Sequence, residues 1–110
     1  MQDPIEIVKF YYFEKLGWCG CGCPSVVLET IAKYLESVEL PYEQRDAKMK
    51  EYFPPNGEEN ELVMCLAYTL DKAGFTDHGT SIFSCRLTDD GKRFLRAIKE
   101  AQKQNALDDF

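Results

Sequence analysis

Apolar residues recur every three or four positions over residues 4–16, which is the spacing of one buried face of an α-helix. An acidic cap, a proline in the first turn and a glycine after the last turn mark its ends, at Asp3, Pro4 and Gly17. The aromatic run at 10–13 would also suit a strand. The spacing nevertheless favours a helix that buries Ile5, Val8, Tyr12 and Leu16.

The same spacing returns after a gap. Residues 24–38 predict a second helix, which begins at Pro24 and buries Leu28, Ile31, Leu35 and Val38. The stretch that follows is less regular. Residues 43–53 are charged and predict a short surface helix, and the Pro-Pro-Asn-Gly sequence at 54–57 predicts a break in the chain's regular structure.

Residues 58–73 predict a third amphipathic helix. Asn56 and Glu59 form a plausible capping pair before it, Gly74 ends it, and Phe75 is placed to pack back against it. The inner face is predicted to carry Leu62, Leu66, Leu70 and Ala73, widened by Val63, Ala67 and Tyr68.

The hydrophobic period then changes to that of a strand. Turn residues at 77–80 and the alternation over 81–87 predict a β-hairpin that spans about 75–87. Thr88 caps a last helix, whose inward residues are predicted to be Phe94, Leu95, Ile98 and Ala101. The predicted fold class is therefore mainly α with one short β-hairpin and a C-terminal helix.

A chain of 110 residues is suited to one domain with a single core, and residues 1–110 are predicted to form it, with 104–110 as a frayed tail. No internal repeat or linker divides the sequence. No apolar stretch approaches the roughly 20 residues that a membrane span needs, and the first residues lack the features of a secretory signal. We therefore expect a cytoplasmic protein without membrane contact, whose thiols stay reduced.

Charge is distributed unevenly. The formal net charge of −6 opposes general binding to nucleic acid, yet residues 86–103 carry six basic and three acidic side chains. Nucleic acid is a candidate partner through Arg86 and one face of the last helix, formed by Lys92, Arg96, Lys99 and Lys103. A solvated charged face is the alternative. The helix over 58–73 is acidic, which disfavours sequence-specific DNA recognition by that helix.

The Cys-Gly-Cys-Gly-Cys run at 19–23 is the strongest candidate for chemistry. Thiolates are good ligands for zinc or Cu(I), and Cys65, Cys85 or His78 could supply a fourth ligand. Against this interpretation, structural zinc sites usually pair their cysteines at wider spacing. The candidate metal ligands are Cys19, Cys21, Cys23 and His78, and zinc is the one cofactor considered.

Two other interpretations of residues 19–23 stay open. The thiols could form a redox pair, because the start of the next helix favours a thiolate at Cys23, but the strand and helix pattern of thioredoxin-like proteins is missing. Alternatively, the glycines and the following Pro24 form a tight joint between two helices, with the thiols packed as small apolar groups. We favour the joint.

Signatures of catalysis are missing from the sequence. His78 is the single histidine, and it is expected to shape a turn with Asp77 as its hydrogen-bond partner. There is no phosphate-binding loop, dinucleotide fingerprint, zinc-protease motif or nucleophile elbow. We therefore predict a protein that is not an enzyme, with no catalytic residue and no small-molecule substrate.

The elements over residues 60–100 follow the order of a helix, a Gly-aromatic end, a hairpin and a capped helix. Together with the Leu-Thr-x-x-Gly-Lys-x-x-Leu stretch at 87–95, this order resembles the third helix, wing and following helix of winged-helix proteins of the MarR and PadR types. The resemblance implies a winged-helix-like domain and, as one function, a DNA-binding transcriptional regulator.

The whole chain is also similar to short proteins carried by phages and mobile elements of Gram-positive bacteria. The similarity rests on the Gly-Cys-Gly-Cys-Pro stretch at 20–24 and the His-Gly-x-Ser stretch at 78–81. An aromatic residue is expected before the Leu-Thr pair in such proteins, whereas Cys85 and Arg86 stand here. The similarity implies no activity.

Taken together, these patterns predict a small non-enzymatic regulatory or interaction protein that acts through a protein partner or by self-association. The first alternative is a winged-helix DNA-binding regulator. The second is a zinc-binding or thiol-redox module formed by residues 19–23.

Overall fold

The computed structural model describes residues 3–17, 24–53, 61–78 and 85–104. In chain order these residues form α1 (Pro4–Lys9), η1 (Phe10–Lys15), α2 (Pro24–Glu39), α3 (Tyr42–Tyr52), α4 (Glu61–Lys72), β1 (Thr76–His78), β2 (Cys85–Leu87) and α5 (Asp89–Lys103). Helices predominate, and the two strands form one antiparallel hairpin. The predicted fold class is confirmed.

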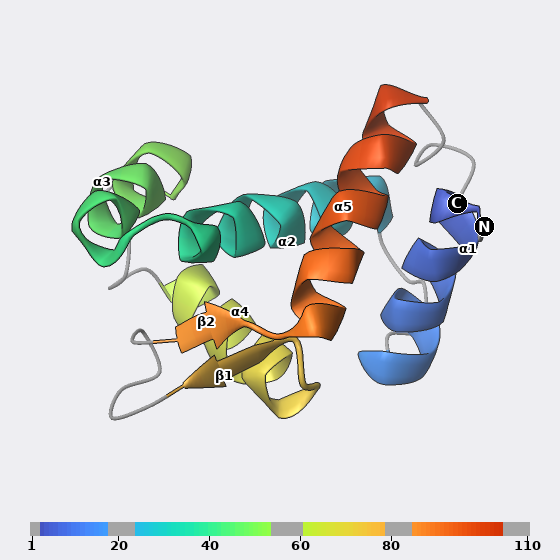
Figure 1. Cartoon of the computed structure of the whole chain (residues 1–110), viewed down its shortest axis with the longest axis horizontal. Coiled ribbons are helices and arrows are strands. Elements are labelled where there is room, and N and C mark those ends of the chain that lie inside the picture. Colours follow the sequence, from blue (N-terminus) through green and yellow to red (C-terminus); the bar gives the residue numbers. More distant parts are fainter. Residues whose placement is uncertain (1–2, 18–23, 54–60, 79–84, 105–110) are drawn as a thin grey trace.

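The helix α2 lies at the centre of the fold. α3, α5 and β2 pack against it, α1 packs against α5, and α4 packs against β1 (Figure 1). The stripe predicted to be buried on α2 is in the core: Leu28, Ile31, Leu35 and Val38. The Cα radius of gyration is 13.3 Å, about the value expected for one domain of this length.

The first helix changes its winding halfway along. The Asp3 carboxylate caps α1 by accepting a hydrogen bond from the backbone N–H of Ile5 at 3.0 Å. The helix continues as η1, a π-helix, and Gly17 follows it with φ +69°. The helix is confirmed over the strand alternative, but its wider π turn buries both Tyr11 and Tyr12, whereas the α-helical period predicted Tyr12 alone.

The helix α3 is docked on the core, although its charged composition predicted a surface helix. Met49 and Phe53 are buried, and they follow Arg45 at intervals of four residues. The guanidinium of Arg45 donates to the carbonyl oxygens of Val38 at 2.9 Å and Leu40 at 3.5 Å. Those carbonyls lie at the end of α2 and just after it, where helices leave backbone acceptors unsatisfied. The arginine therefore joins α3 to α2.

The helix α4 buries most of the predicted face, but not its two edges. Leu62 and Tyr68, both expected to point inward, are 50% and 59% exposed. Among the described elements, α2 and β1 pack against α4, and its buried side carries Val63, Leu66, Ala67 and Leu70. The predicted capping pair, Asn56 and Glu59, lies outside the described residues. The core therefore leaves several apolar side chains of α4 uncovered.

Thr88 lies between the hairpin and α5 and also contacts the turn that follows α4. Thr76 pairs with Leu87 across the strands, and residues 79–84 of the predicted hairpin lie outside the described part. The Thr88 hydroxyl accepts from the Gly91 N–H at 3.1 Å, as predicted for a cap, and donates to the Gly74 carbonyl at 2.6 Å. Gly74 has φ +89°, in agreement with its predicted role as a helix end. Thr88 thus fixes the start of α5 to the end of α4.

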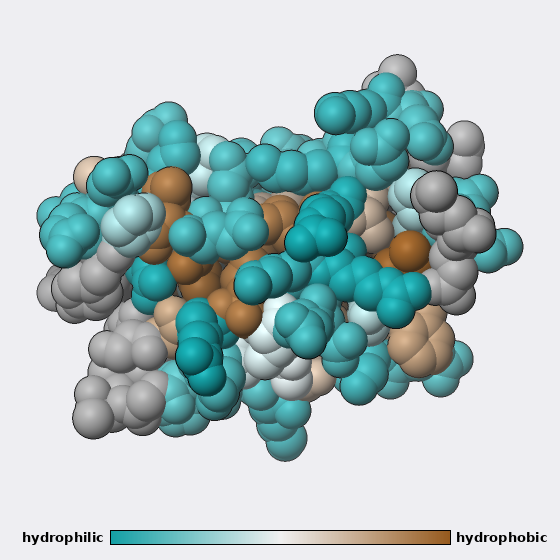
Figure 2. Space-filling view, viewed as in Figure 1, coloured by the Kyte–Doolittle hydropathy of each residue, from teal (hydrophilic) through white to brown (hydrophobic). Residues whose placement is uncertain are grey.

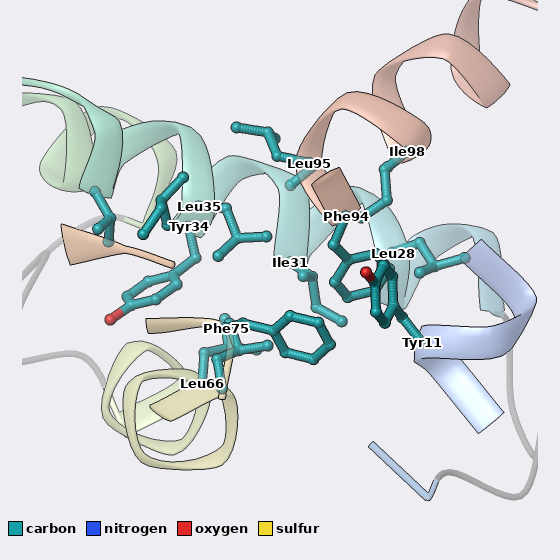
Figure 3. Close-up of a cluster of buried hydrophobic side chains, with 14 of the residues drawn as sticks. Tyr11, Leu28, Ile31, Tyr34, Leu35, Leu66, Phe75, Phe94, Leu95 and Ile98 are labelled. Carbon is teal, nitrogen blue, oxygen red and sulfur yellow. The ribbon is translucent and has the colours of Figure 1, made fainter. Parts of the chain in front are cut away.

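Three aromatic rings from η1, α5 and the residue before β1 meet in the core. The Phe75 and Phe94 ring centroids lie 4.8 Å apart, and Tyr11 lies 5.2 Å from Phe75 and 5.3 Å from Phe94 (Figure 3). The Tyr11 hydroxyl donates to Asp90 Oδ1 at 3.1 Å. On α5 the predicted inward residues are buried: Phe94, Leu95, Ile98 and Ala101.

Candidate functional site

The predicted metal ligands fall only partly within the described residues. Cys19, Cys21 and Cys23 lie outside them. His78 lies on β1 with an exposed ring, and its Nδ1 is 2.9 Å from Asp71 Oδ1 on α4. The expectation that Asp77 would be its partner is wrong. The residue before the histidine points to the opposite side of a strand, and the Asp77 carboxylate instead lies 3.8 Å from the Arg86 guanidinium.

The two cysteines in the described residues occupy different environments. Cys65 is exposed on α4, and Cys85 is buried on β2. Within the described ranges, no three histidine, cysteine or acidic side chains come together in a group that could hold a metal ion. The metal hypothesis therefore stays a prediction from the sequence of residues 19–23.

Cys85 belongs instead to a buried polar pair between β2 and α2. Its Sγ lies 3.8 Å from the Tyr34 hydroxyl, which points away from the aromatic rings in Figure 3. Burial raises the pKa of the Cys85 thiol, and burial together with the neighbouring thiol raises the pKa of Tyr34. The positive charge of Arg45 partly opposes both shifts. Both groups are therefore held neutral, which is unfavourable for a reactive nucleophile.

The raised pKa values of Tyr34 and Cys85 predict that the protein becomes less stable at alkaline pH. Both pKa values are higher in the folded protein than in the unfolded chain. Below the ordinary pKa values of cysteine and tyrosine, unfolding releases no proton from these groups and the free energy of unfolding is unaffected. Above them, unfolding releases a proton, so the free energy of unfolding falls as the pH rises. We expect urea unfolding to give a lower free energy of unfolding at pH 10 than at pH 8. The double variant Tyr34→Phe, Cys85→Ala should show a smaller fall.

The matched control for that variant is Tyr68→Phe, because Tyr68 is an exposed tyrosine on α4. It should keep the whole alkaline loss of stability. A fall of equal size in the double variant and in the control would contradict the assignment of this loss to Tyr34 and Cys85.

The predicted basic residues lie on exposed positions, and some are already paired. Lys99 Nζ lies 3.2 Å from Glu36 Oε2 on α2, and Arg86 is the residue paired with Asp77. The others are exposed on α5: Lys92, Arg96 and Lys103. Figure 2 shows hydrophilic surface over α5, with hydrophobic surface in the hollow between α5 and α3. Lys99 therefore links α5 to α2, while the exposed side chains of Lys92, Arg96 and Lys103 fit either of the two predicted roles, a solvated face or nucleic-acid contact.

The outer side of α4 is an apolar surface that the predicted helix face did not anticipate. Leu62, Met64 and Tyr68 are 50%, 40% and 59% exposed, and Cys65 is exposed beside them. Glu61 and Lys72, also exposed, stand at the two ends of the helix. We refer to this surface as the α4 outer face, defined by Glu61, Leu62, Met64, Cys65, Tyr68 and Lys72.

An apolar groove of about 260 Å³ adjoins this face. Val26, Val27 and Thr30 of α2 form one wall, and α4 supplies Leu62, Cys65, Leu66 and Thr69. The described lining carries no charged side chain. Val26, at its edge, is 58% exposed. A surface signal was present in the sequence, since the apolar residues of this helix spread over more of its circumference than one buried stripe needs.

None of the helices in the described part of the chain combines the length and the apolar character needed to cross a membrane. Comparisons with protein-family models, with curated proteins and with solved structures found no match. The surface chemistry of the described residues is therefore the basis for a functional proposal.

Proposed function

We propose that this chain is a small non-enzymatic interaction protein that binds another protein surface through the α4 outer face and the adjoining groove. The observation that carries the proposal is the exposure of Leu62 and Tyr68 on a helix whose opposite side is fully buried. Covering apolar surface contributes about 25 cal/mol per Å². A large aromatic side chain such as Tyr68 is typical of the residues that dominate binding.

The groove also indicates the chemistry of the partner. Its walls are two helices with uncharged side chains, Val26 on one side and Leu62 on the other. Grooves of this kind accept the apolar side of an amphipathic helix, which inserts side chains spaced three or four residues apart. A helical protein segment is therefore a better occupant than nucleic acid, whose recognition requires hydrogen-bond donors to phosphate.

A winged-helix DNA-binding regulator is the second candidate, and the exposed basic residues of α5 are the observation that favours it. Against it stands the chemistry of α4, which the winged-helix resemblance would place in the major groove. Lys72 is the one basic residue between positions 61 and 72, and the centre of the outer face is apolar. Direct base recognition usually relies on arginine, lysine, asparagine or glutamine, so we favour a protein partner.

Site-specific photo-crosslinking in cells that naturally produce the protein tests the proposal. A photoreactive phenylalanine analogue replaces Tyr68 in one variant and Arg96, on the exposed side of α5, in a matched control. We expect ultraviolet light to join the Tyr68 variant to a protein and to leave the Arg96 variant without a protein adduct. Mass spectrometry of the adduct shows whether the captured protein is a second copy or a different chain.

A salt-titrated DNA-binding assay separates the two candidates. We expect no salt-sensitive binding to duplex DNA, because the molecule carries a net charge of −6 and Lys72 is the one basic residue of its α4. The proposal would be overturned by salt-sensitive binding that the triple variant Lys92→Glu, Arg96→Glu, Lys99→Glu abolishes, combined with no protein adduct at Tyr68.

A further inference from the structure

The α4 outer face has its charges arranged along one line of the helix. Glu61, Cys65, Tyr68 and Lys72 are spaced at i, i+4, i+7 and i+11, which places them on one side over about three turns. All four are exposed. The line therefore has an acidic end, an uncharged centre and a basic end, with Leu62 beside it.

This line is complementary to itself when it is reversed. In two copies of α4 packed antiparallel about a two-fold axis, Glu61 of each copy faces Lys72 of the other, and Cys65 of each faces Tyr68 of the other. Such an isologous contact uses one surface twice. Parallel packing would oppose like charges at both ends, which is unfavourable. The antiparallel arrangement also places each helix N-terminus near the C-terminus of the other helix, which suits their dipoles.

We propose that the occupant of the α4 outer face is a second copy of this chain, bound antiparallel through α4. The inference rests on the proposed function, because it names the partner of the same surface. Charge complementarity at the two ends selects the arrangement. The uncharged centre at Cys65 and Tyr68, with Leu62 beside the line, contributes the burial. Val26 at the edge of the groove extends the contact beyond α4.

The dimer is expected to be reversible. α4 has 12 residues, so it is about 18 Å long, whereas standard stable interfaces bury about 1,600 Å² in total. A single pair of short helices with part of the groove falls at or below that size. We therefore expect a monomer–dimer equilibrium with a dissociation constant of about 1–100 μM.

Charge exchange at the two ends of α4 tests the arrangement. Sedimentation velocity of the full chain should show dimers of the wild type at high concentration. Glu61→Lys and Lys72→Glu, each alone, should weaken the dimer about tenfold, because each places like charges at both ends. An equimolar mixture of the two variants should regain the dimer, because in the mixed pair a lysine faces a glutamate at both ends.

Two further variants complete the experiment. Tyr68→Glu should abolish the dimer and leave the circular dichroism spectrum unchanged, because Tyr68 is 59% exposed. Lys103→Glu changes the net charge as Lys72→Glu does but lies on α5, so its dimer should equal that of the wild type.

A wild type that stays monomeric at its highest soluble concentration would overturn the inference. So would a mixture of the two charge variants that is no more dimeric than each variant alone. If the wild type is monomeric while the photoreactive Tyr68 variant captures a different protein, the second-copy inference fails and the proposed function stands. If that variant captures no protein, the proposed function fails with it.

Discussion

The substitution Gly91→Ala is expected to lower the free energy of unfolding by about 3 kcal/mol. The direction of this change is informative, because glycine to alanine at an open helix position raises the free energy of unfolding by about 1 kcal/mol. Gly91 lies in the first turn of α5, where the helix passes over the start of β1. A Cβ there would overlap the backbone carbonyl oxygen of Phe75. That oxygen accepts a hydrogen bond from the Thr88 N–H at 3.1 Å, so moving it disturbs the cap.

The matched control is Gly17→Ala. Gly17 has φ +69° and no neighbouring atom within 4 Å of an added Cβ, so the cost is conformational only and should be about 1 kcal/mol. Urea unfolding followed by circular dichroism measures both. If Gly91→Ala lowers the free energy of unfolding no more than Gly17→Ala does, the space between α5 and the Phe75 carbonyl can accept a Cβ, and the prediction is wrong.

The substitution Phe94→Ala is expected to cost about 4 kcal/mol. Phe94 is fully buried and contacts the rings of Tyr11 and Phe75, so its removal leaves a cavity bounded by three parts of the chain. A domain of this size usually has about 5–15 kcal/mol of stability. The variant should therefore unfold at a much lower urea concentration than the wild type.

Two comparisons make the result specific to this cluster. Phe94→Leu keeps most of the volume and should cost less than about 1.5 kcal/mol. Phe10→Ala removes an aromatic ring that is 53% exposed and should cost less than about 1 kcal/mol. Equal losses for Phe94→Ala and Phe10→Ala would show that the cluster does not hold η1 against α5.

The candidate interaction surface and the two stability predictions concern different helices, because the surface lies on α4 whereas Gly91 and Phe94 lie on α5. The core side of α4 and the Gly74–Phe75 turn hold the hairpin and α5 in place, while the α4 outer face is left to solvent. Tyr68→Glu should therefore change binding without changing stability, and Gly91→Ala should do the reverse. This separation allows a loss of binding to be distinguished from a loss of folding.

Local signals in the sequence predicted those parts of the fold that depend on neighbouring residues. The Thr88 cap, the Gly17 and Gly74 helix ends and the buried stripe of α2 were all predictable, because capping, positive φ and helical period act over a few residues. The composition of residues 43–53 concealed the docking of α3. Met49 and Phe53 of that segment are buried, Tyr52 packs partly against the core, and Arg45 adds hydrogen bonds to α2.

The candidate site was harder to predict from the sequence than the helix ends. One wide apolar sector of α4 contains the exposed residues Leu62 and Tyr68 and the buried residues Val63 and Leu66. Helical periodicity alone does not say which part of that sector the rest of the protein buries. The predicted hydrogen bond between Asp77 and His78 is wrong for a related reason. The partner of His78 is Asp71, which α4 brings close only when β1 packs against it.

The sequence by itself determined several helix ends, at Asp3, Gly17, Gly74 and Thr88, and that the chain forms mainly helices with one hairpin. Only the tertiary structure decided which side of α4 is left uncovered, that α3 docks through Arg45, and that Phe75, Phe94 and Tyr11 meet. The physical reason is that capping and periodicity are local energies, whereas burial depends on which distant segment occupies the space beside a residue.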